Sequence, residues 1–576
     1  MADEPIDAVT EIVADAGIGG RPLRQLILRL TESPAALEDL IRDFAVPRRT
    51  VEALLRAAGP DLDDGVLPQR YRDRFTLRPR PPADTAPPAA GPQTPDHARN
   101  HASAALIAGV PAGDRATEHA SAAPISGTPA ACRPLDQVMA ALIAGAPAAD
   151  RALDHVSATA ETAARRAAWL GATFDLAGAH LLCVGDHDLT SLAVDRAGLG
   201  CRVSVVDVDE RLLEYIAAQA PGVDCYYGDL RFGLPPALAG TADLIFTDPP
   251  YTPEGVQLFL GRGAQALRDR TNGRLVMAYG FSPLTPALGL KVQKAMLELD
   301  LVLEAILPTF NRYHGAQAIG SAADLYVCRP TTHTWPILDQ RLGRIATNIY
   351  THGGQSLEAA TAPPSPSPTA SAGLPAAVSP GPPGALRPHE VLAGGPRPRE
   401  TATVDLSGDP GPWLLRALLA LNCASVTLLV PNHHPDLADA AGQAALRELV
   451  AAKWDLRFRR STPGPKQAIV EATASMSIRL PVNVPPTTKP PHDSVTDSQP
   501  ASGTGSLGQT PPARRPGAGG PGPSQQAHWL LTHAHGKVGN ALRTLGRADL
   551  LERPTWVDAR LIDLPRAAIV RLLRAL

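Results

Sequence analysis

Short apolar runs alternate with helical segments through the middle of this 576-residue chain, and this alternation restricts the fold more than any other feature. The runs lie at residues 181–184, 203–208, 225–227, 244–247, 275–280 and 301–308. Each is too short for a helix and mostly apolar, as expected for strands that are buried on both faces. Strands that are joined through helices pair in parallel. The pattern therefore predicts an α/β fold with a Rossmann-like core of the class I methyltransferase type.

Stretches rich in proline and glycine divide the rest of the chain. There are 59 prolines and 49 glycines but only 4% aromatic residues, a mixture typical of folded domains separated by structureless linkers. We expect linkers at residues 81–131, 355–400 and 484–526. They separate a winged-helix-like domain (1–80), the core (150–345), a small α/β piece (401–483) and a helical piece (527–576). The last two pieces, a C-terminal α/β or helical extension, are candidates to fold together.

The first 80 residues show the helix order of a winged-helix or helix-turn-helix module. The expected helices are Pro22–Leu30, one that begins with Ser33-Pro34 as cap and first turn, and Arg48–Ala58. A DNA-reading role needs the basic residues at 48 and 49 to face a groove, but acidic residues at 39, 43 and 52 surround them. The formal net charge is also -3, so we favour a packing or dimerisation module, with a homodimer as one arrangement, over nucleic-acid binding.

Neither a membrane segment nor a metal site is indicated. No apolar run approaches the ~20 residues of a membrane span, and the acidic N-terminus does not resemble a secretion signal. The six cysteines lack C-x-x-C spacing, so we interpret them as small core residues in a reducing compartment. The adjacent His433 and His434 have no third ligand nearby. We expect a cytoplasmic protein without membrane contact, metal or permanently bound cofactor.

The turn after the first core strand is acidic rather than glycine-rich. Gly185 is followed by Asp186, His187 and Asp188, where a nucleotide-binding turn usually has several glycines that let backbone amides approach a phosphate or carboxylate. Carboxylates attract a cation instead, which disfavours NAD, ATP and the carboxylate-bearing S-adenosylmethionine. Decarboxylated S-adenosylmethionine, with a sulfonium and an ammonium, fits better. The alternative is that these aspartates only stabilise a helix N-terminus.

Two further strand ends carry aspartates that suit an adenosyl group. Asp207 follows the second strand, where a carboxylate can accept hydrogen bonds from both ribose hydroxyls. Asp229 closes the third strand and could accept one from the adenine amino group. With Gly185, these residues form the predicted donor-binding set. Each aspartate taken alone is as consistent with a helix cap or a turn.

The fourth strand ends in the run Asp248-Pro249-Pro250-Tyr251. The prolines fix the backbone and withhold N–H donors, so their carbonyls and the Asp248 carboxylate form an acceptor rim for an amine. Tyr251 can lie against the substrate. A D-P-P-Y run at this strand end is what amine-methylating enzymes present to a nucleobase amino group. It indicates N-alkylation, whichever group is transferred, and the alternative is an ordinary turn.

Three segments together resemble the branched-chain polyamine synthases, the N(4)-bis(aminopropyl)spermidine synthase family. They are GDHDLTS at 185–191, VDVDERL at 206–212 and TDPPYTPEG at 247–255. Residues around Asp154-His155 also resemble the segment before that family's core, and the resemblance covers roughly residues 150–330. It implies transfer of the aminopropyl group of decarboxylated S-adenosylmethionine to the secondary amine of a spermidine-like polyamine, with release of methylthioadenosine.

The resemblance also implies roles for the predicted site residues. We expect Asp186, Asp188 and Asp248 to be catalytic, because an attacking amine must pass its proton to a carboxylate. Asp188 and Asp248 are expected nearest the reacting nitrogen. The acceptor-binding residues are Pro249, Pro250, Tyr251, through a cation–π contact, and Glu254, which with Asp186 is expected to hold distal ammonium groups. Residues 311–315 together with 321–326 either close this pocket or form an ordinary strand-loop-strand structure.

One position departs from the family pattern. The acidic loop of the family reads GDDD, whereas His187 occupies the middle position here. An imidazole that is partly charged near neutral pH would repel a polyamine, so we expect an effect on the acceptor.

Two other functions remain open from the residues alone. The core is also consistent with an S-adenosylmethionine-dependent N-methyltransferase that acts on a nucleic-acid or protein amine. The N-terminal helices are consistent with a DNA-binding regulator whose core senses a ligand.

Overall fold

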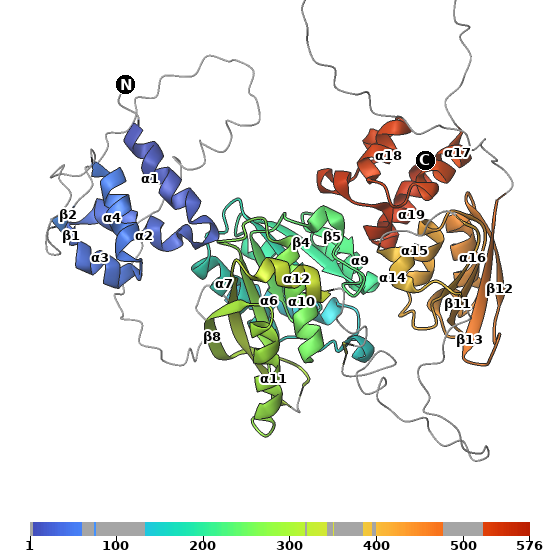
Figure 1. Ribbon diagram of the computed structural model, residues 1–576, viewed down its shortest axis with the longest axis horizontal. Coiled ribbons are helices and arrows are strands. Elements are labelled where there is room, and N and C mark those ends of the chain that lie inside the picture. Colours follow the sequence, from blue (N-terminus) through green and yellow to red (C-terminus); the bar gives the residue numbers. More distant parts are fainter. Residues whose placement is uncertain are drawn as a thin grey trace, which may run out of the picture. The chain divides into compact units, whose positions relative to one another are not determined.

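The computed structural model describes residues 4–59, 74–75, 133–316, 319–342, 349–350, 384–393, 399–475 and 522–576 (Figure 1). The predicted linker 81–131 lies outside these ranges, as do most of 355–400 and of 484–526. The chain divides into two compact units, Met1–Gln137 with Trp169–Asp175, and Val138–Ala168 with Leu176–Leu576. Within the described ranges, no helix combines the length and apolarity that a membrane crossing requires.

The first unit has a small hydrophobic core of its own. Its elements are α1 (Glu4–Asp15), α2 (Arg21–Glu32), α3 (Leu37–Phe44), α4 (Arg48–Ala57) and a two-residue ladder of β1 (Ala35–Ala36) with β2 (Arg74–Phe75). Leu23, Leu26 and Leu30 of α2 recur at helical spacing and are buried. Ser33 does not cap a new helix as predicted; it ends α2, and α3 begins only at Leu37. The winged-helix interpretation stays a prediction.

The second unit contains a seven-stranded sheet, which confirms the predicted α/β core with a mainly parallel sheet. The strand order is β5-β4-β3-β6-β7-β9-β8. The strands are β3 (His180–Val184), β4 (Arg202–Asp207), β5 (Asp224–Tyr227), β6 (Leu244–Thr247), β7 (Arg274–Tyr279), β8 (Leu301–Arg312) and β9 (Ala322–Pro330). Strands β3 to β7 pair in parallel, and β3, β5 and β6 are buried along their whole length. Their apolar sequence follows from this burial on both faces.

Helices connect the parallel strands and lead into the sheet. They are α6 (Arg133–Gly145), α7 (Ala160–Thr173), α8 (Thr190–Ala197), α9 (Glu210–Gln219), α10 (Pro253–Ala266), α11 (Pro286–Leu297) and α12 (Thr334–Arg341). Strand β9 pairs antiparallel with both of its neighbours, β7 and the edge strand β8. The strand-loop-strand alternative for residues 311–326 agrees with β8 and β9, but the sequence pattern gives neither the extent of β9 nor its pairing with β7.

A four-stranded sheet in the order β10-β11-β13-β12 follows the core (orange in Figure 1). Its elements are α14 (Pro388–Leu392), β10 (Arg399–Asp405), α15 (Trp413–Ala420), β11 (Cys423–Pro431), α16 (Ala440–Val450), β12 (Trp454–Arg459) and β13 (Gln467–Ala474). Strands β10 and β11 are parallel across α15, and the other pairs are antiparallel. Helix α14 and the start of β10 fall within the stretch 355–400 that the composition assigns to a linker.

The last helices follow this sheet, and the first of them packs against α15. They are α17 (Pro523–Thr532), α18 (Val538–Thr544) and α19 (Arg566–Ala575), drawn in red in Figure 1. The buried Lys453 joins the two pieces, because its Nζ donates to the carbonyl oxygens of Leu419 (2.6 Å) and Leu531 (3.0 Å). His528 is likewise bonded to the Ala452 carbonyl oxygen at 2.7 Å. We refer to residues 384–576 as the C-terminal part.

The buried lysine predicts a pH dependence of stability. Burial lowers the pKa of Lys453 to about 7, so the unfolded chain binds more protons than the folded chain between this value and the ordinary value of 10.5. The contribution of Lys453 to stability therefore rises with pH over this window, by at most about 1.4 kcal/mol per pH unit. Thermal and urea unfolding of the full chain measure this effect. The unfolding free energy of wild type should rise relative to that of Lys453→Met from pH 7 to 10.

Lys537→Met, which removes an exposed lysine of the same part, serves as the control. A difference between wild type and Lys453→Met that stays constant across this pH range would contradict the prediction.

Candidate active site

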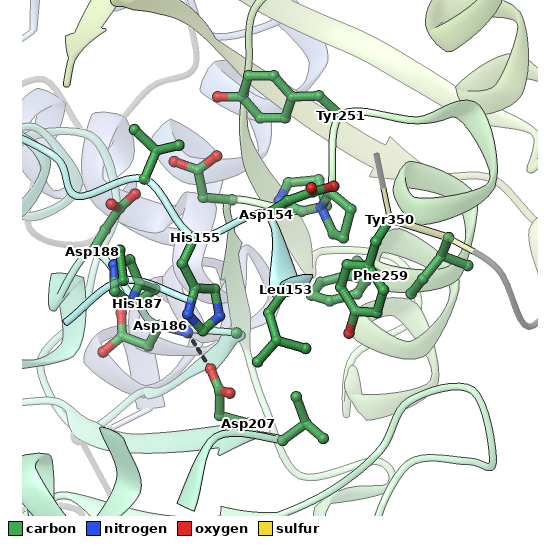
Figure 2. A pocket seen from close by; sticks show the side chains of 18 of the residues that line it. Leu153, Asp154, His155, Asp186, His187, Asp188, Asp207, Tyr251, Phe259 and Tyr350 are labelled. Atoms are coloured by element: carbon green, nitrogen blue, oxygen red, sulfur yellow. Dashed lines mark hydrogen bonds between the residues drawn. The ribbon is translucent and has the colours of Figure 1, made fainter. Parts of the chain in front are cut away.

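A cavity of about 810 Å³ opens at the carboxyl ends of β3, β4, β5 and β6 (Figure 2). The loops after these four strands line it, together with residues 149–157 and 313–316. All but one of the predicted site residues lie in its wall: Gly185, Asp186, Asp188, Asp207, Asp229, Asp248, Pro249, Pro250 and Tyr251. The exception is Glu254, which lies in the first turn of α10 outside the wall. Figure 2 shows the loop Asp186–Asp188 on one side of the cavity and Phe259 with Tyr350 on the other.

A fully buried arginine, Arg166 of α7, lies behind this wall. Each of its five N–H groups has an acceptor, at 2.8–3.2 Å. The acceptors are the side-chain oxygens of Asn311, Asp188, Thr190, Asp248 and Tyr313. One planar guanidinium thus bridges two of the predicted catalytic carboxylates, Asp188 at 2.8 Å and Asp248 at 2.9 Å.

The two bridged carboxyl groups differ in their electrostatic surroundings. Burial opposes the ionisation of Asp188, but the charge of Arg166 and the hydrogen bonds from Arg166 and Asp248 together outweigh it and hold the pKa of Asp188 below its ordinary value. Burial raises the pKa of Asp248 well above its ordinary value, and the charge of Asp188 adds to this effect. Carboxyl groups whose pKa values are pushed apart suit different roles in proton transfer. Asp248 is the better candidate to take up a proton.

Two tyrosines extend this network. The Tyr313 hydroxyl donates to the Asp248 carboxylate at 2.6 Å, and the Tyr251 hydroxyl donates to that of Tyr313 at 3.2 Å. The ring of Tyr251 packs at 5.1 Å from that of Tyr279. The sequence left residues 311–315 and 321–326 open between a pocket wall and an ordinary strand-loop-strand structure. Both hold, because residues 313–316 line the wall and β8 and β9 flank them.

Asp186 is arranged differently from the other predicted catalytic residues. It is buried, and its carboxylate accepts hydrogen bonds from the backbone N–H of Ser191 (3.2 Å) and from the Ser191 hydroxyl. Burial raises the pKa of Asp186 to about 8. The carboxylate is thus engaged with the first turn of α8, which differs from the expectation that it holds a distal ammonium group of the acceptor.

His187 is stacked on His155, with ring centroids 4.2 Å apart and ring planes 13° apart. Its Nε2 is also hydrogen-bonded to the Ser157 hydroxyl at 3.2 Å. Burial, together with His155, lowers the pKa of His187 to about 4. The imidazole is therefore neutral at neutral pH, which corrects the expectation that its charge repels a polyamine. It removes one negative charge relative to GDDD without adding a positive one.

The predicted ribose ligand Asp207 lies beside the acidic loop. Its carboxylate accepts the backbone N–H groups of Asp186 (3.0 Å, dashed in Figure 2) and Asp209 (2.8 Å). Burial raises the pKa of Asp207 to about 6, so it is mainly ionised at neutral pH. Gly185 has φ 69°, and a Cβ there would lie 3.1 Å from the Phe259 ring. A glycine is needed at this turn for both reasons.

The Asp229 carboxylate already accepts hydrogen bonds from as many donors as its oxygens can take. Its carboxylate accepts from the backbone N–H and guanidinium of Arg231 at 2.6–3.1 Å and from the Trp413 indole N–H at 3.0 Å. Two donors reach each carboxylate oxygen, which occupies its lone pairs. This arrangement differs from the expectation that Asp229 directly accepts the adenine amino group.

The wall as a whole is acidic. It contains six aspartates, the five above and Asp154, but only the arginines 151 and 231. Arg231 is paired with Asp229, and Arg151 is exposed. In the described part of the chain, no group of His, Cys, Asp and Glu side chains is arranged to hold a metal ion. The cavity therefore favours an organic cation.

Several wall and network residues are missed by the sequence analysis. Arg166 has a signal in the sequence, because residues three and four apart share one face of a helix. It lies three and four residues after Ala163 and Thr162, which are buried, so a charged group lies on the buried face of α7. Trp413 has none, because it is 184 residues from Asp229 along the chain.

Comparisons with known proteins agree with the motifs. Residues 135–340 match the family described as the branched-chain polyamine synthase A C-terminal domain, which confirms the predicted resemblance. An uncharacterized protein of Methanocaldococcus jannaschii is 39% identical over 28% of this chain and 42% of its own length. The N(4)-bis(aminopropyl)spermidine synthase of Thermococcus kodakarensis is 32% identical over 27% of this chain and 46% of its own.

Among solved structures, one similar chain is a mutein of the Thermus thermophilus branched-chain polyamine synthase in complex with N4-aminopropylspermidine and 5'-methylthioadenosine. It is 21% identical, with a TM-score of 0.33, and the match covers 61% of this chain and 98% of that chain. The matched region spans less than half the length of the two curated relatives above.

Arg166→Met should both destabilise the protein and abolish its activity. Removing the guanidinium leaves Asp188 and Asp248 buried without a counter-charge, which costs about 3–5 kcal/mol of unfolding free energy. Arg165→Met is the matched control, since Arg165 is the neighbour on α7 and contacts Phe310, through a hydrogen bond to its carbonyl oxygen at 2.6 Å and over its ring. Unfolding curves of the full chain compare the two.

Adding Asp248→Asn to Arg166→Met should recover part of the lost stability, because it removes one uncompensated charge. Equal destabilisation by the two arginine substitutions would contradict the central role of Arg166.

Proposed function

We propose, on the premise that residues 135–340 carry the C-terminal domain of the branched-chain polyamine synthases, that the chain is an aminopropyltransferase. It moves the aminopropyl group of decarboxylated S-adenosylmethionine to an amine of a spermidine-like polyamine and releases methylthioadenosine. The curated relatives named N(4)-bis(aminopropyl)spermidine synthase support this activity.

The observation that carries the proposal is the pair of carboxylates held on Arg166 in an acidic cavity. In the reaction the acceptor nitrogen forms a bond to the aminopropyl carbon, the bond from this carbon to sulfur breaks, and the sulfonium becomes a neutral thioether. The nitrogen must also lose one proton. Asp248 is placed to take it, because the charge of the bound donor favours its ionised form, while Asp188 stays ionised on Arg166 and stabilises the positive charge at the nitrogen.

The acceptor would lie along the run from Asp248 to Tyr251. Pro249 and Pro250 are buried in the wall and offer carbonyl oxygens but no N–H groups. The ring of Tyr251, fixed by Tyr279 and Tyr313, offers a face to an ammonium group. Glu254 lies outside the wall and is not included in the acceptor site.

The donor would lie along the loops after β3, β4 and β5, which all line the cavity. Gly185 lets the backbone turn closely beside Phe259, and the ionised Asp207 suits the ribose hydroxyls. A methionine carboxylate would need a cation, but the wall has six aspartates against the exposed Arg151 and Arg231, which is paired with Asp229. This electrostatic argument favours the decarboxylated donor, and no permanently bound cofactor is needed.

Mass spectrometry of reaction products tests the proposed activity. The full chain supplied with decarboxylated S-adenosylmethionine and spermidine should form methylthioadenosine and a branched polyamine. A panel of polyamines of different length then defines the acceptor. Because His187 is neutral, the acidic loop should offer the acceptor fewer anionic contacts than a GDDD loop provides. Turnover with carboxylated S-adenosylmethionine alone would favour the N-methyltransferase instead.

Asp248→Asn should lower kcat by roughly 10²–10⁴-fold, because the proton acceptor is lost while the shape of the site is retained. The KM for the donor should change little. Asp195→Asn, which alters an aspartate of α8 outside the cavity, is the control. Unchanged kcat in Asp248→Asn would remove this residue from the mechanism.

A further inference from the structure

Helix α15 of the C-terminal part reaches the loop after β5, which belongs to the proposed donor site. Trp413, the first residue of α15, is buried and donates its indole N–H to Asp229 at 3.0 Å. Its ring packs edge-on to Phe232 with centroids 5.0 Å apart. The Arg231 guanidinium lies 5.1 Å from the centre of the same ring. Trp413 therefore contacts both members of the Asp229–Arg231 pair that lines the cavity.

The Trp413 N–H completes the coordination of the Asp229 carboxylate. The other three bonds to this carboxylate come from Arg231, two residues further along the same loop. Such local bonds fix the carboxylate relative to its own loop but not relative to the rest of the protein. Trp413 ties this carboxylate to a distant element, and its loss would leave a buried acceptor with one donor fewer.

A second residue of α15 reaches the loop after β4. The Arg416 side chain is buried and forms an ion pair with Glu210, which follows the proposed ribose ligand Asp207 by three residues. Its guanidinium also lies 4.0 Å from the centre of the Tyr227 ring at the end of β5. One helix thus contacts both strand ends that carry the proposed donor-binding aspartates.

The start of α15 is itself held rigidly. The Asp409 carboxylate accepts the backbone N–H groups of Trp413 (2.9 Å) and Leu414 (2.7 Å), as an N-terminal cap does. His434 Nε2 lies 3.1 Å from the same carboxylate, and both side chains are fully buried. This contact gives His434, which the sequence shows beside His433 without a third ligand, a role in placing Trp413.

We propose that α15 is a functional part of the donor site, with Trp413 as a positioning residue that orients Asp229 and Arg231 for binding of the adenosyl group. The inference rests on the proposed aminopropyl transfer. It makes donor affinity depend on a part of the chain outside residues 135–340. Trp413 does not touch the reacting atoms and acts through the loop that it holds.

The test separates the indole N–H from the bulk of the ring. Trp413→Phe keeps an aromatic ring against Phe232 and Arg231 but removes the donor to Asp229. Trp454→Phe is the matched control, because the Trp454 N–H donates at 2.7 Å to the Leu418 carbonyl oxygen inside the C-terminal part. Calorimetry on the full-length proteins measures the Kd of methylthioadenosine, the nucleoside that the proposed reaction releases, without requiring turnover.

We expect Trp413→Phe to weaken methylthioadenosine binding about tenfold, as the loss of one hydrogen bond to a charged group implies. The donor KM should rise by a similar factor with kcat little changed, and Trp454→Phe should bind as wild type does. In an Asp229→Asn background, the effect of Trp413→Phe should shrink, because both substitutions act on the same contact.

Other outcomes overturn the inference. Unchanged binding by Trp413→Phe would show that the contact is packing only, and tighter binding would show that the indole competes with the adenine for Asp229. Equal weakening by Trp454→Phe would reduce the effect to general loosening of the C-terminal part. If wild type itself neither binds methylthioadenosine nor transfers aminopropyl groups, the proposed function fails, which is distinguishable from a normal wild type with an unaffected Trp413→Phe.

Discussion

The buried guanidinium of Arg166 is the interaction on which the site depends. A charge removed from water is tolerated only when its hydrogen-bonding groups are paired, and all five N–H groups of Arg166 are. Its partners come from the loops after β3 and β6 and from the end of β8, so satisfying one side chain brings distant segments together. The spacing of Asp188 and Asp248 follows from the planar shape of the guanidinium.

The same low-polarity surroundings govern the chemistry of the cavity. Burial raises the pKa values of Asp186, Asp207 and Asp248, whereas Arg166 keeps that of Asp188 low. Burial also keeps His187 neutral. The wall can therefore gain negative charge when a cation enters, because a nearby positive charge favours ionised carboxylates. A polyamine and a sulfonium nucleoside are ligands that would use this property.

The C-terminal part has its own sheet and also contacts the loops that line the candidate active site. Its sheet and last helices enclose Lys453, and its helix α15 holds the loops after β4 and β5 through Arg416 and Trp413. The loops at the carboxyl ends of parallel strands carry most of the binding residues in such folds, and they have few local contacts to fix them. A helix such as α15, which contacts these loops, can therefore stabilise the donor site without lining the cavity itself.

The sequence by itself determined the parallel core, because buried strands need continuous apolar runs, and it located nearly all wall aspartates, because the ends of parallel strands share one edge. It missed β10 and β12 and gave β9 only as one of two alternatives for residues 311–326. It also placed Glu254 in a cavity that this residue does not line. Only the tertiary structure decided which carboxylates are free to act. Asp186 is bonded to Ser191 and Asp229 to Arg231, which are local partners. Trp413 and Arg166, in contrast, are brought to Asp229 and to Asp188 with Asp248 from distant parts of the chain, and spatial proximity rather than distance along the chain decides such partners.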